Sequence, residues 1–343
     1  MSAQPNLIDT EKMVAHLRAR AINVERREIL VSKLSGSDQE GDLTLPPNCD
    51  GLGRVRHFKH KTAKGWPSNP LPIEPARQAL GLPPEHSEMT AQVFQNAACP
   101  WRCWYCFVPY NLLSANPARS VWATAEHLVA LYEKDEHRPM IIDLSGGSPD
   151  LIPEWTVWMM RALKEAELAN ATYLWSDDNL STTFLFDKLS FGDIEDLQSY
   201  QNYGRVCCFK GFDEASFTFN TQADASGYLR QFEIMQRMLK LDIDLYGYIT
   251  LTSPRTSDLS GQISAFFDQL QAIHPNLPLR IIPLRISAYG PVHARMNDER
   301  TLSLALQEEA IACWNNEITA RFANDLRTMP IYNVPIKAFG AAG

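Results

Sequence analysis

The chain has 343 residues, with 32 Lys and Arg against 40 Asp and Glu and a formal net charge of −8. This length suits one α/β barrel with an added segment, and the acidic balance argues against general nucleic-acid binding. Seven cysteines without regular pairing, no apolar leader after Met1 and no apolar run near twenty residues predict a cytoplasmic protein that contacts no membrane.

Residues 1–89 are predicted to form an N-terminal extension that could cap a substrate pocket. A charged, amphipathic start at 11–27 precedes a Gly/Asp/Pro-rich section, and repeated Pro and Gly over 65–84 predict irregular chain. Several basic residues lie between these sections, and they are Arg54, Arg56, Lys59, Lys61 and Lys64. Two interpretations stay open for them, a grip on a phosphate or carboxylate and a solvated basic loop.

From Thr90 onward, apolar runs alternate with longer amphipathic segments. The predicted strands are 92–97, 140–144, 172–176, 205–209, 244–252 and 279–286. The predicted helices are 124–134, 154–169, 225–240, 260–273 and 300–326, with an irregular segment at 182–200. Six strand-then-helix units predict an α/β fold with a parallel sheet and right-handed crossovers, with a core at 90–327 and a strand or tail at 328–343.

Three cysteines, Cys99, Cys103 and Cys106, stand within eight residues directly after the first predicted strand. Their spacing lets three thiolates meet one inorganic centre but leaves a fourth ligand position to be filled. A structural zinc site is usually closed by a second Cys or His pair, and no such pair follows. An iron–sulfur cluster held by three thiolates keeps one iron open for chemistry. Zinc and reduced core cysteines remain the alternatives.

This Cys-x3-Cys-x2-Cys loop, with the aromatic Tyr105 before its last cysteine, resembles the signature of the radical S-adenosylmethionine (SAM) superfamily. The resemblance implies a partial (β/α)6 TIM-like barrel, with one [4Fe-4S] cluster on the three cysteines and SAM chelated at the open iron. It further implies reductive cleavage of SAM to a 5′-deoxyadenosyl radical, which removes a hydrogen atom from the substrate. Flavodoxin or ferredoxin is the implied electron donor.

In such barrels the reacting groups lie at the carboxyl ends of the strands. The second predicted strand is followed by Gly146, Gly147 and Ser148, where glycine lets the backbone approach a ligand closely. The segment resembles the Gly-Gly-Glu-Pro motif that binds the SAM amino group, although Ser148 offers only a neutral hydroxyl where the family has a carboxylate. An ordinary turn is the alternative.

The third predicted strand ends in Asp177 and Asp178. It is similar to the Asp-Thr-Asn-Gly segment of activating enzymes for glycyl-radical proteins, such as the pyruvate formate-lyase activating enzyme. The resemblance places Asp177 on the motif aspartate, where it would orient the ammonium group or ribose hydroxyls of SAM. Helix capping is the alternative, and for Asp178 it is as well supported as a functional role.

The fourth predicted strand carries Cys208 and Lys210, and it resembles the Asp-Leu-Lys strand of the same activating enzymes. A lysine at the end of an apolar strand needs an anion, and the SAM carboxylate is the implied partner. Because strand side chains alternate, Cys208 shares a face with Lys210. Its thiol is a candidate donor of a hydrogen atom to a substrate radical, or else a small buried side chain.

The last two predicted strands carry weaker motifs. Ile249 resembles the Gly-x-Ile strand that packs on adenine, and Arg285 stands where the activating enzymes have a histidine. Arg285 would clamp a carboxylate of SAM or substrate, or else form a surface salt bridge.

The leading hypothesis is therefore a radical SAM enzyme that acts on a peptide or protein. The alternatives are the same chemistry on a nucleotide, sugar or amino acid, and a non-catalytic regulator that binds SAM or a cluster.

Overall fold

The computed structural model describes residues 7–60, 68–254 and 256–336. Lys61 and Lys64, two of the basic residues noted above, lie outside this range. Within it, no helix is both long enough and apolar enough to cross a membrane.

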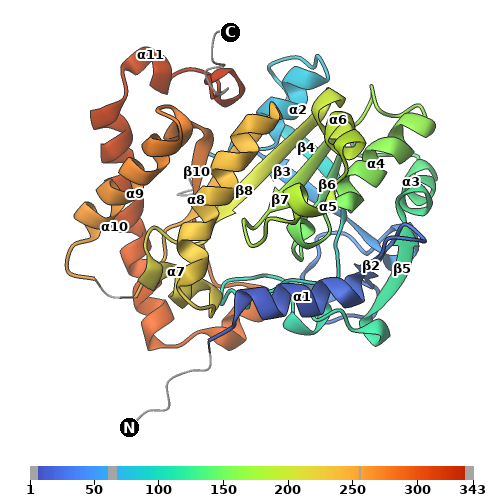
Figure 1. Ribbon diagram of the computed structural model, residues 1–343, viewed down its shortest axis with the longest axis horizontal. Helices are drawn as coiled ribbons and strands as arrows, with labels where there is room; N and C mark the ends of the chain where they lie inside the picture. Colours follow the sequence, from blue (N-terminus) through green and yellow to red (C-terminus); the bar gives the residue numbers. More distant parts are fainter. Residues whose placement is uncertain (1–6, 61–67, 255, 337–343) are drawn as a thin grey trace.

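One seven-stranded sheet organises the chain (Figure 1), and its strands β4 to β10 run parallel, apart from β5, which belongs to a smaller sheet. In spatial order the strands are β10 (Ile281–Leu284), β9 (Leu245–Thr250), β8 (Tyr203–Phe209), β7 (Tyr173–Asp178), β6 (Ile141–Leu144), β4 (Glu88–Phe94) and β3 (Gly53–Lys59). All six predicted strands are present in the predicted parallel order. The α/β partial barrel predicted from the sequence is therefore confirmed.

Strand β3 was not predicted, and it lies antiparallel to β4 at one edge of the sheet. Arg54 pairs with Val93 in the register and Arg56 pairs with Ala91. The solvated-loop interpretation of this basic segment is therefore wrong for residues 53–59. Alternating charged side chains concealed the strand, because a buried strand face is ordinarily apolar.

Helices cover the outer face of the sheet. They are α3 (Ala125–Glu133), α4 (Glu154–Glu165), α6 (Phe191–Ser199), α8 (Ser226–Met238), α9 (Leu259–Ile273) and α10 (Asp298–Arg321). The five predicted helices are confirmed, although the last one stops at Arg321 and a short α11 (Asn324–Arg327) follows.

Two segments predicted as irregular contain helices. Residues 182–200 form α5 (Phe184–Lys188) and α6, and a capping box between Ser190 and Asp193 starts α6. The Pro/Gly-rich stretch contains α2 (Ile73–Ala79). Pro75 lies in the first turn of α2, where a backbone N–H has no intrahelical acceptor, so that proline is tolerated there.

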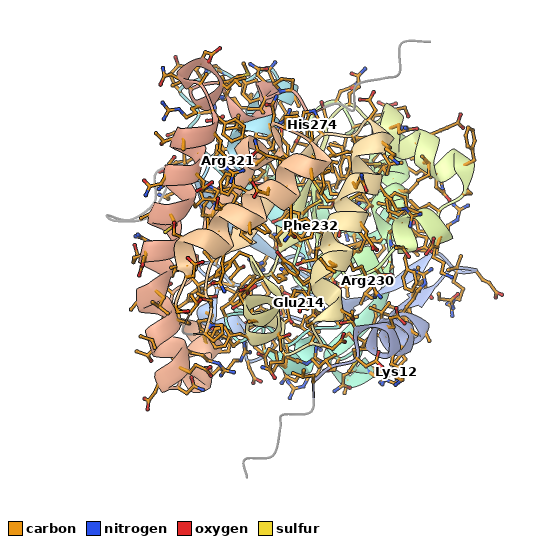
Figure 2. All side chains as sticks on the ribbon, turned by 60° about the vertical axis from the view of Figure 1, so that its left-hand side comes forward. Lys12, Glu214, Arg230, Phe232, His274 and Arg321 are labelled. Atoms are coloured by element: carbon orange, nitrogen blue, oxygen red, sulfur yellow. The ribbon has the colours of Figure 1, made fainter. Side chains whose placement is uncertain are left out.

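The two faces of the sheet are buried differently. On the outer side, Phe209 of β8 packs on Phe232 of α8 and Phe266 of α9, with ring centroids 5.4 and 5.7 Å away. Figure 2 shows Phe232 between these helices. On the inner side, Trp175 and Tyr246 pack with α2 in a separate cluster.

The N-terminal segment closes the carboxyl end of the barrel. Helix α1 (Thr10–Ala21) lies across the lower edge of the molecule in Figure 1 and is followed by β1 (Ile22–Asn23) and β2 (Glu28–Ser32). Strand β2 pairs antiparallel with β5 (Ser120–Thr124), which comes after the cysteine loop. Arg230 of α8, labelled in Figure 2, forms an ion pair with Glu11 of α1. The division at residue 89 stays a prediction.

The described part of the predicted tail, residues 328–336, contains a short 3-10 turn, Ile331–Asn333. Arg280 holds it by donating hydrogen bonds to the Tyr332 and Val334 carbonyls at 2.9 Å each.

Candidate functional site

A cavity of about 490 Å³ opens where the parallel strands end. The predicted site residues that line it are Cys99, Cys103, Tyr105, Cys106, Gly146, Gly147, Asp177, Cys208, Lys210 and Arg285. Ser148 and Ile249 do not line it. Parallel strands deliver their loops to one edge, which is why motifs spread over about 190 residues of sequence meet in one place.

The cysteine loop is held from behind by two tryptophans. Trp101 and Trp104 are 1% and 0% exposed, and their indole N–H groups donate to Thr10 Oγ1 and Asn220 Oδ1 at 3.1 Å each. Asn220 also donates to the Lys210 carbonyl at 2.7 Å, which couples the loop to the end of β8. Asn220 was not predicted, and no sequence motif marks it.

Burial sets the pKa values of the three cysteine thiols. It raises the pKa of Cys99 to about 12 and that of Cys103 to about 11, and it also raises the pKa of Cys106. Without a metal these side chains are therefore neutral thiols at neutral pH, whereas a bound metal would deprotonate them.

Among the described residues, no group of three or more His, Cys, Asp or Glu side chains converges as a single metal ion requires. In a cubane cluster each thiolate binds a different iron, so the three sulfurs need not meet at one point. The trio lines one sheltered cavity and fits an iron–sulfur cluster in this respect.

The glycine turn after β6 packs closely on Gln95 and Asn96, just before the cysteine loop. Gly146 and Gly147 have φ values of +79° and +73°, which disfavour other residues. A Cβ atom on Gly147 would lie 1.8 Å from Asn96 Oδ1. Only glycine therefore fits, and the backbone of this turn faces the cavity.

The Ser148 side chain is turned away from the cavity and is fully buried. Its hydroxyl donates to Asp150 Oδ1 at 2.5 Å and accepts from Asn179 Nδ2 at 2.9 Å. In this structure its hydroxyl therefore braces the turn, and the role of Ser148 in SAM binding stays a prediction of the sequence resemblance.

Cys208 and Lys210 both line the cavity, as their shared strand face predicts. Burial acts to lower the pKa of Lys210, but the neighbouring Cys208 and Tyr105 groups, which ionise only at high pH, raise it above its ordinary value, so the ammonium group is charged at neutral pH. No ion pair joins Lys210 to another described residue within 4.0 Å. Burial raises the pKa of Cys208 to about 12, so its sulfur keeps its proton.

Asp177 and Asp178 are adjacent in β7 and point in opposite directions. Asp177 lines the cavity, and burial followed by the nearby Asp143 carboxylate raises its pKa to about 7. Asp178 accepts hydrogen bonds from Arg205 Nε at 3.0 Å and Nη2 at 2.6 Å, and both side chains are buried. Asp178 also accepts from the Leu180 N–H at 2.6 Å. Its role is therefore structural, as a buried ion pair rather than a helix cap.

The two weakest predicted residues have different environments. Ile249 is fully buried on the outer face of the sheet, among the side chains that meet α8 and α9. Its neighbours Tyr248 and Thr250 point inward, and Thr250 donates to the Tyr105 hydroxyl at 3.0 Å. Arg285 lies at the cavity rim and forms an ion pair with Glu308.

Sequence reasoning missed Asp143, a fully buried carboxylate in β6. The signal was present, because an aspartate within the apolar run Ile141-Ile142-Asp143-Leu144 is costly to bury without a purpose. Arg56 of β3 lines the cavity and approaches Asp143 at 3.7 Å.

No family model matches the chain, and no curated protein matches it. Among solved structures, it is similar to Streptococcus suis SuiB bound to S-adenosylmethionine, at 14% identity and a TM-score of 0.46 over 68% of this chain and 48% of SuiB. It is also similar to TYW1 with a lysine-pyruvate adduct bound, at 11% identity and a TM-score of 0.41 over 76% of this chain and 84% of TYW1.

The matched part of the chain thus spans about half the length of SuiB. At these values neither likeness assigns a family or an activity.

Proposed function

We propose that this chain is a radical SAM enzyme. The proposal rests on one observation: the three cysteines, the glycine turn and Lys210 come from separate strand ends and line one cavity. A loop that bound a metal only for structural reasons would not need the glycine turn or Lys210 beside it. The similarity to glycyl-radical activating enzymes is part of this proposal.

Cys99, Cys103 and Cys106 would hold a [4Fe-4S] cluster, which when bound supplies the electron that splits the sulfonium bond of SAM. The backbone of Gly146 and Gly147 is open to the cavity and can accept from the SAM amino group. Lys210, a cation without an ion-pair partner among the described residues, offers a donor to the SAM carboxylate. Ser148 and Ile249 would contribute to SAM binding only indirectly, by shaping the backbone of the segments that contain them.

Cys208 is proposed as a donor of a hydrogen atom to the substrate radical. Its thiol keeps its proton at neutral pH and faces the cavity with 6% of the residue exposed. That proton leaves with one electron as a hydrogen atom, and the sulfur is left as a thiyl radical, which one electron from the flavodoxin or ferredoxin donor and one proton from water would convert back to the thiol.

The substrate is proposed to be a peptide or protein carbon. A small molecule is the second candidate, because Arg56, Phe58 and Asn69 from the first ninety residues line the cavity. The competing proposal is not an enzyme but a regulator that binds SAM without turnover.

One experiment separates these functions. The protein is reconstituted anaerobically with iron and sulfide, reduced with dithionite and given SAM, and 5′-deoxyadenosine and methionine are quantified. An enzyme forms both products, whereas a regulator binds SAM without forming either.

Cys103→Ala is expected to remove both the cluster absorbance and the cleavage, because a cluster left with two protein thiolates is not retained. Cys313→Ala, on α10 away from the cavity, is the matched control and is expected to behave like the wild type. Zinc in place of iron after anaerobic purification would contradict the proposal.

A further inference from the structure

Beside the predicted SAM groups, the cavity wall formed by β3 carries charged side chains that the proposed chemistry does not use. We propose that this wall binds an oxyanion of the substrate, a carboxylate or a phosphate, through Arg56 and Arg54. That the bound anion is part of the substrate rests on the proposed function. That the site binds an anion at all rests only on the arginines and their surroundings.

The geometry of β3 brings both arginines to the inner face. Arg54 and Arg56 are two residues apart on one strand, so their side chains leave the same side of the sheet. Arg56 lines the cavity and its side chain is 40% exposed. Arg54 lies behind it and is 6% exposed.

Aromatic rings hold both guanidinium groups by their faces. The Arg56 guanidinium lies 4.3 Å from the Phe58 ring centroid, and the Arg54 guanidinium lies 5.2 Å from that of Phe107. Contacts of this kind leave the N–H edges of a guanidinium free to form in-plane hydrogen bonds. Both groups are thus oriented before any ligand binds.

Among the described side chains, the N–H donors of these two arginines lack hydrogen-bond acceptors that would satisfy them. Arg54 Nε and Nη2 are buried and lack a hydrogen-bond partner, as do both carboxylate oxygens of Asp143. The nearest approach between Arg56 and Asp143 is 3.7 Å, which is too long for a hydrogen bond. Buried donors of Arg54 that make no hydrogen bond are costly, so an additional acceptor group at this place would be stabilising.

The balance of charge favours an anion as this ligand. Arg54 and Arg56 are cations near the carboxyl groups of Asp143 and Asp177, and the proposed function already assigns Lys210 to the SAM carboxylate. Burial raises the pKa of both carboxyl groups, so the negative charge on this wall is less than two at neutral pH. A planar guanidinium also matches a carboxylate or phosphate in a bidentate manner, which a lone amine or hydroxyl group would not exploit.

Two sources could supply such an oxyanion, the substrate and the carboxylate of SAM itself. The test therefore uses inorganic phosphate and acetate as probes on the anaerobically reconstituted full-length protein, with and without SAM. Binding is measured by isothermal titration calorimetry for wild type, Arg56→Gln, Arg56→Lys and Lys59→Gln. Lys59 is the matched control, because it lies on the same strand with its side chain on the other face and pairs only with exposed Glu88.

We expect at least one probe to bind wild type in the presence of SAM and to bind Arg56→Gln at least tenfold more weakly. Arg56→Lys should fall between them, since it keeps the charge but loses the planar fork, and Lys59→Gln should match wild type. Preference for phosphate or for acetate identifies the oxyanion of the substrate.

Three results would overturn the inference: neither probe binds wild type, Arg56→Gln keeps full affinity although its melting temperature shows that it is folded, or SAM displaces the probe. The last result would assign the arginines to SAM. A failure of the proposed function gives a different result, since wild type would then produce no 5′-deoxyadenosine whatever its affinity for the probes.

Discussion

Breaking the buried Asp178–Arg205 pair from one side should strongly destabilise this barrel. The two side chains are 2% and 1% exposed, and Arg205 donates two hydrogen bonds to one carboxylate oxygen. Burial raises the pKa of Asp178 to about 6 and Arg205 opposes this rise, so the carboxyl group is ionised at neutral pH. In Asp178→Ala, Arg205 keeps only the Tyr203 hydroxyl, 3.1 Å from Nη1.

Removing one partner of a fully buried pair leaves an uncompensated charge, so Asp178→Ala is expected to lower the free energy of unfolding by about 3–5 kcal/mol. The matched control is Glu88→Ala, because Glu88 pairs with Lys59 at 3.0 Å with both side chains about half exposed. That change is expected to cost less than about 1 kcal/mol.

The assay is urea unfolding of the reduced, cluster-free protein, followed by circular dichroism at neutral pH. The double variant Asp178→Leu with Arg205→Met is expected to recover most of the loss, because no buried charge remains unpaired. If Asp178→Ala loses no more stability than Glu88→Ala, the interpretation of this pair as a buried, ionised contact is wrong.

Three further predictions concern the cavity. Folding raises the Asp177 pKa from 3.8 to about 7. The contribution of its protonated form to the free energy of unfolding is therefore fully present below about pH 3.8 and is lost as the pH rises through about 7. Asp177→Asn, which cannot ionise, should therefore gain on wild type by a few kcal/mol at most between about pH 5 and about pH 8 in urea unfolding; an equal difference at both pH values would contradict this. Lys210→Ala should keep the cluster absorbance and weaken SAM binding at least tenfold by equilibrium dialysis, and unchanged affinity would remove Lys210 from the SAM site. Cys208→Ala should spare SAM cleavage and change the substrate product seen by mass spectrometry, whereas an identical product would exclude the hydrogen-donor role.

Prediction from the sequence worked best where the pattern is local. The six parallel strands follow from apolar runs of four to seven residues separated by amphipathic helices, and strand alternation alone places Cys208 and Lys210 on one face. The same alternation points Asp177 and Asp178 to opposite faces of the sheet.

Prediction was incomplete where a residue depends on distant partners. The motif position of Ser148 does not reveal that its hydroxyl bonds with Asp150 and Asn179. Strand β3 was missed because its arginines look like those of a surface loop until β4 is placed beside them. The partner of Arg205 also lies 27 residues away on another strand.

The sequence by itself determined the order of strands and helices, the cysteine loop and the expectation that its chemistry lies at the strand ends, because each depends on periodicity or spacing along a few neighbouring residues. Only the tertiary structure decided which polar side chains face the cavity and which are paired in the core. Burial and charge pairing depend on what the folded chain brings alongside each group, and segments more than a hundred residues apart supply those neighbours here.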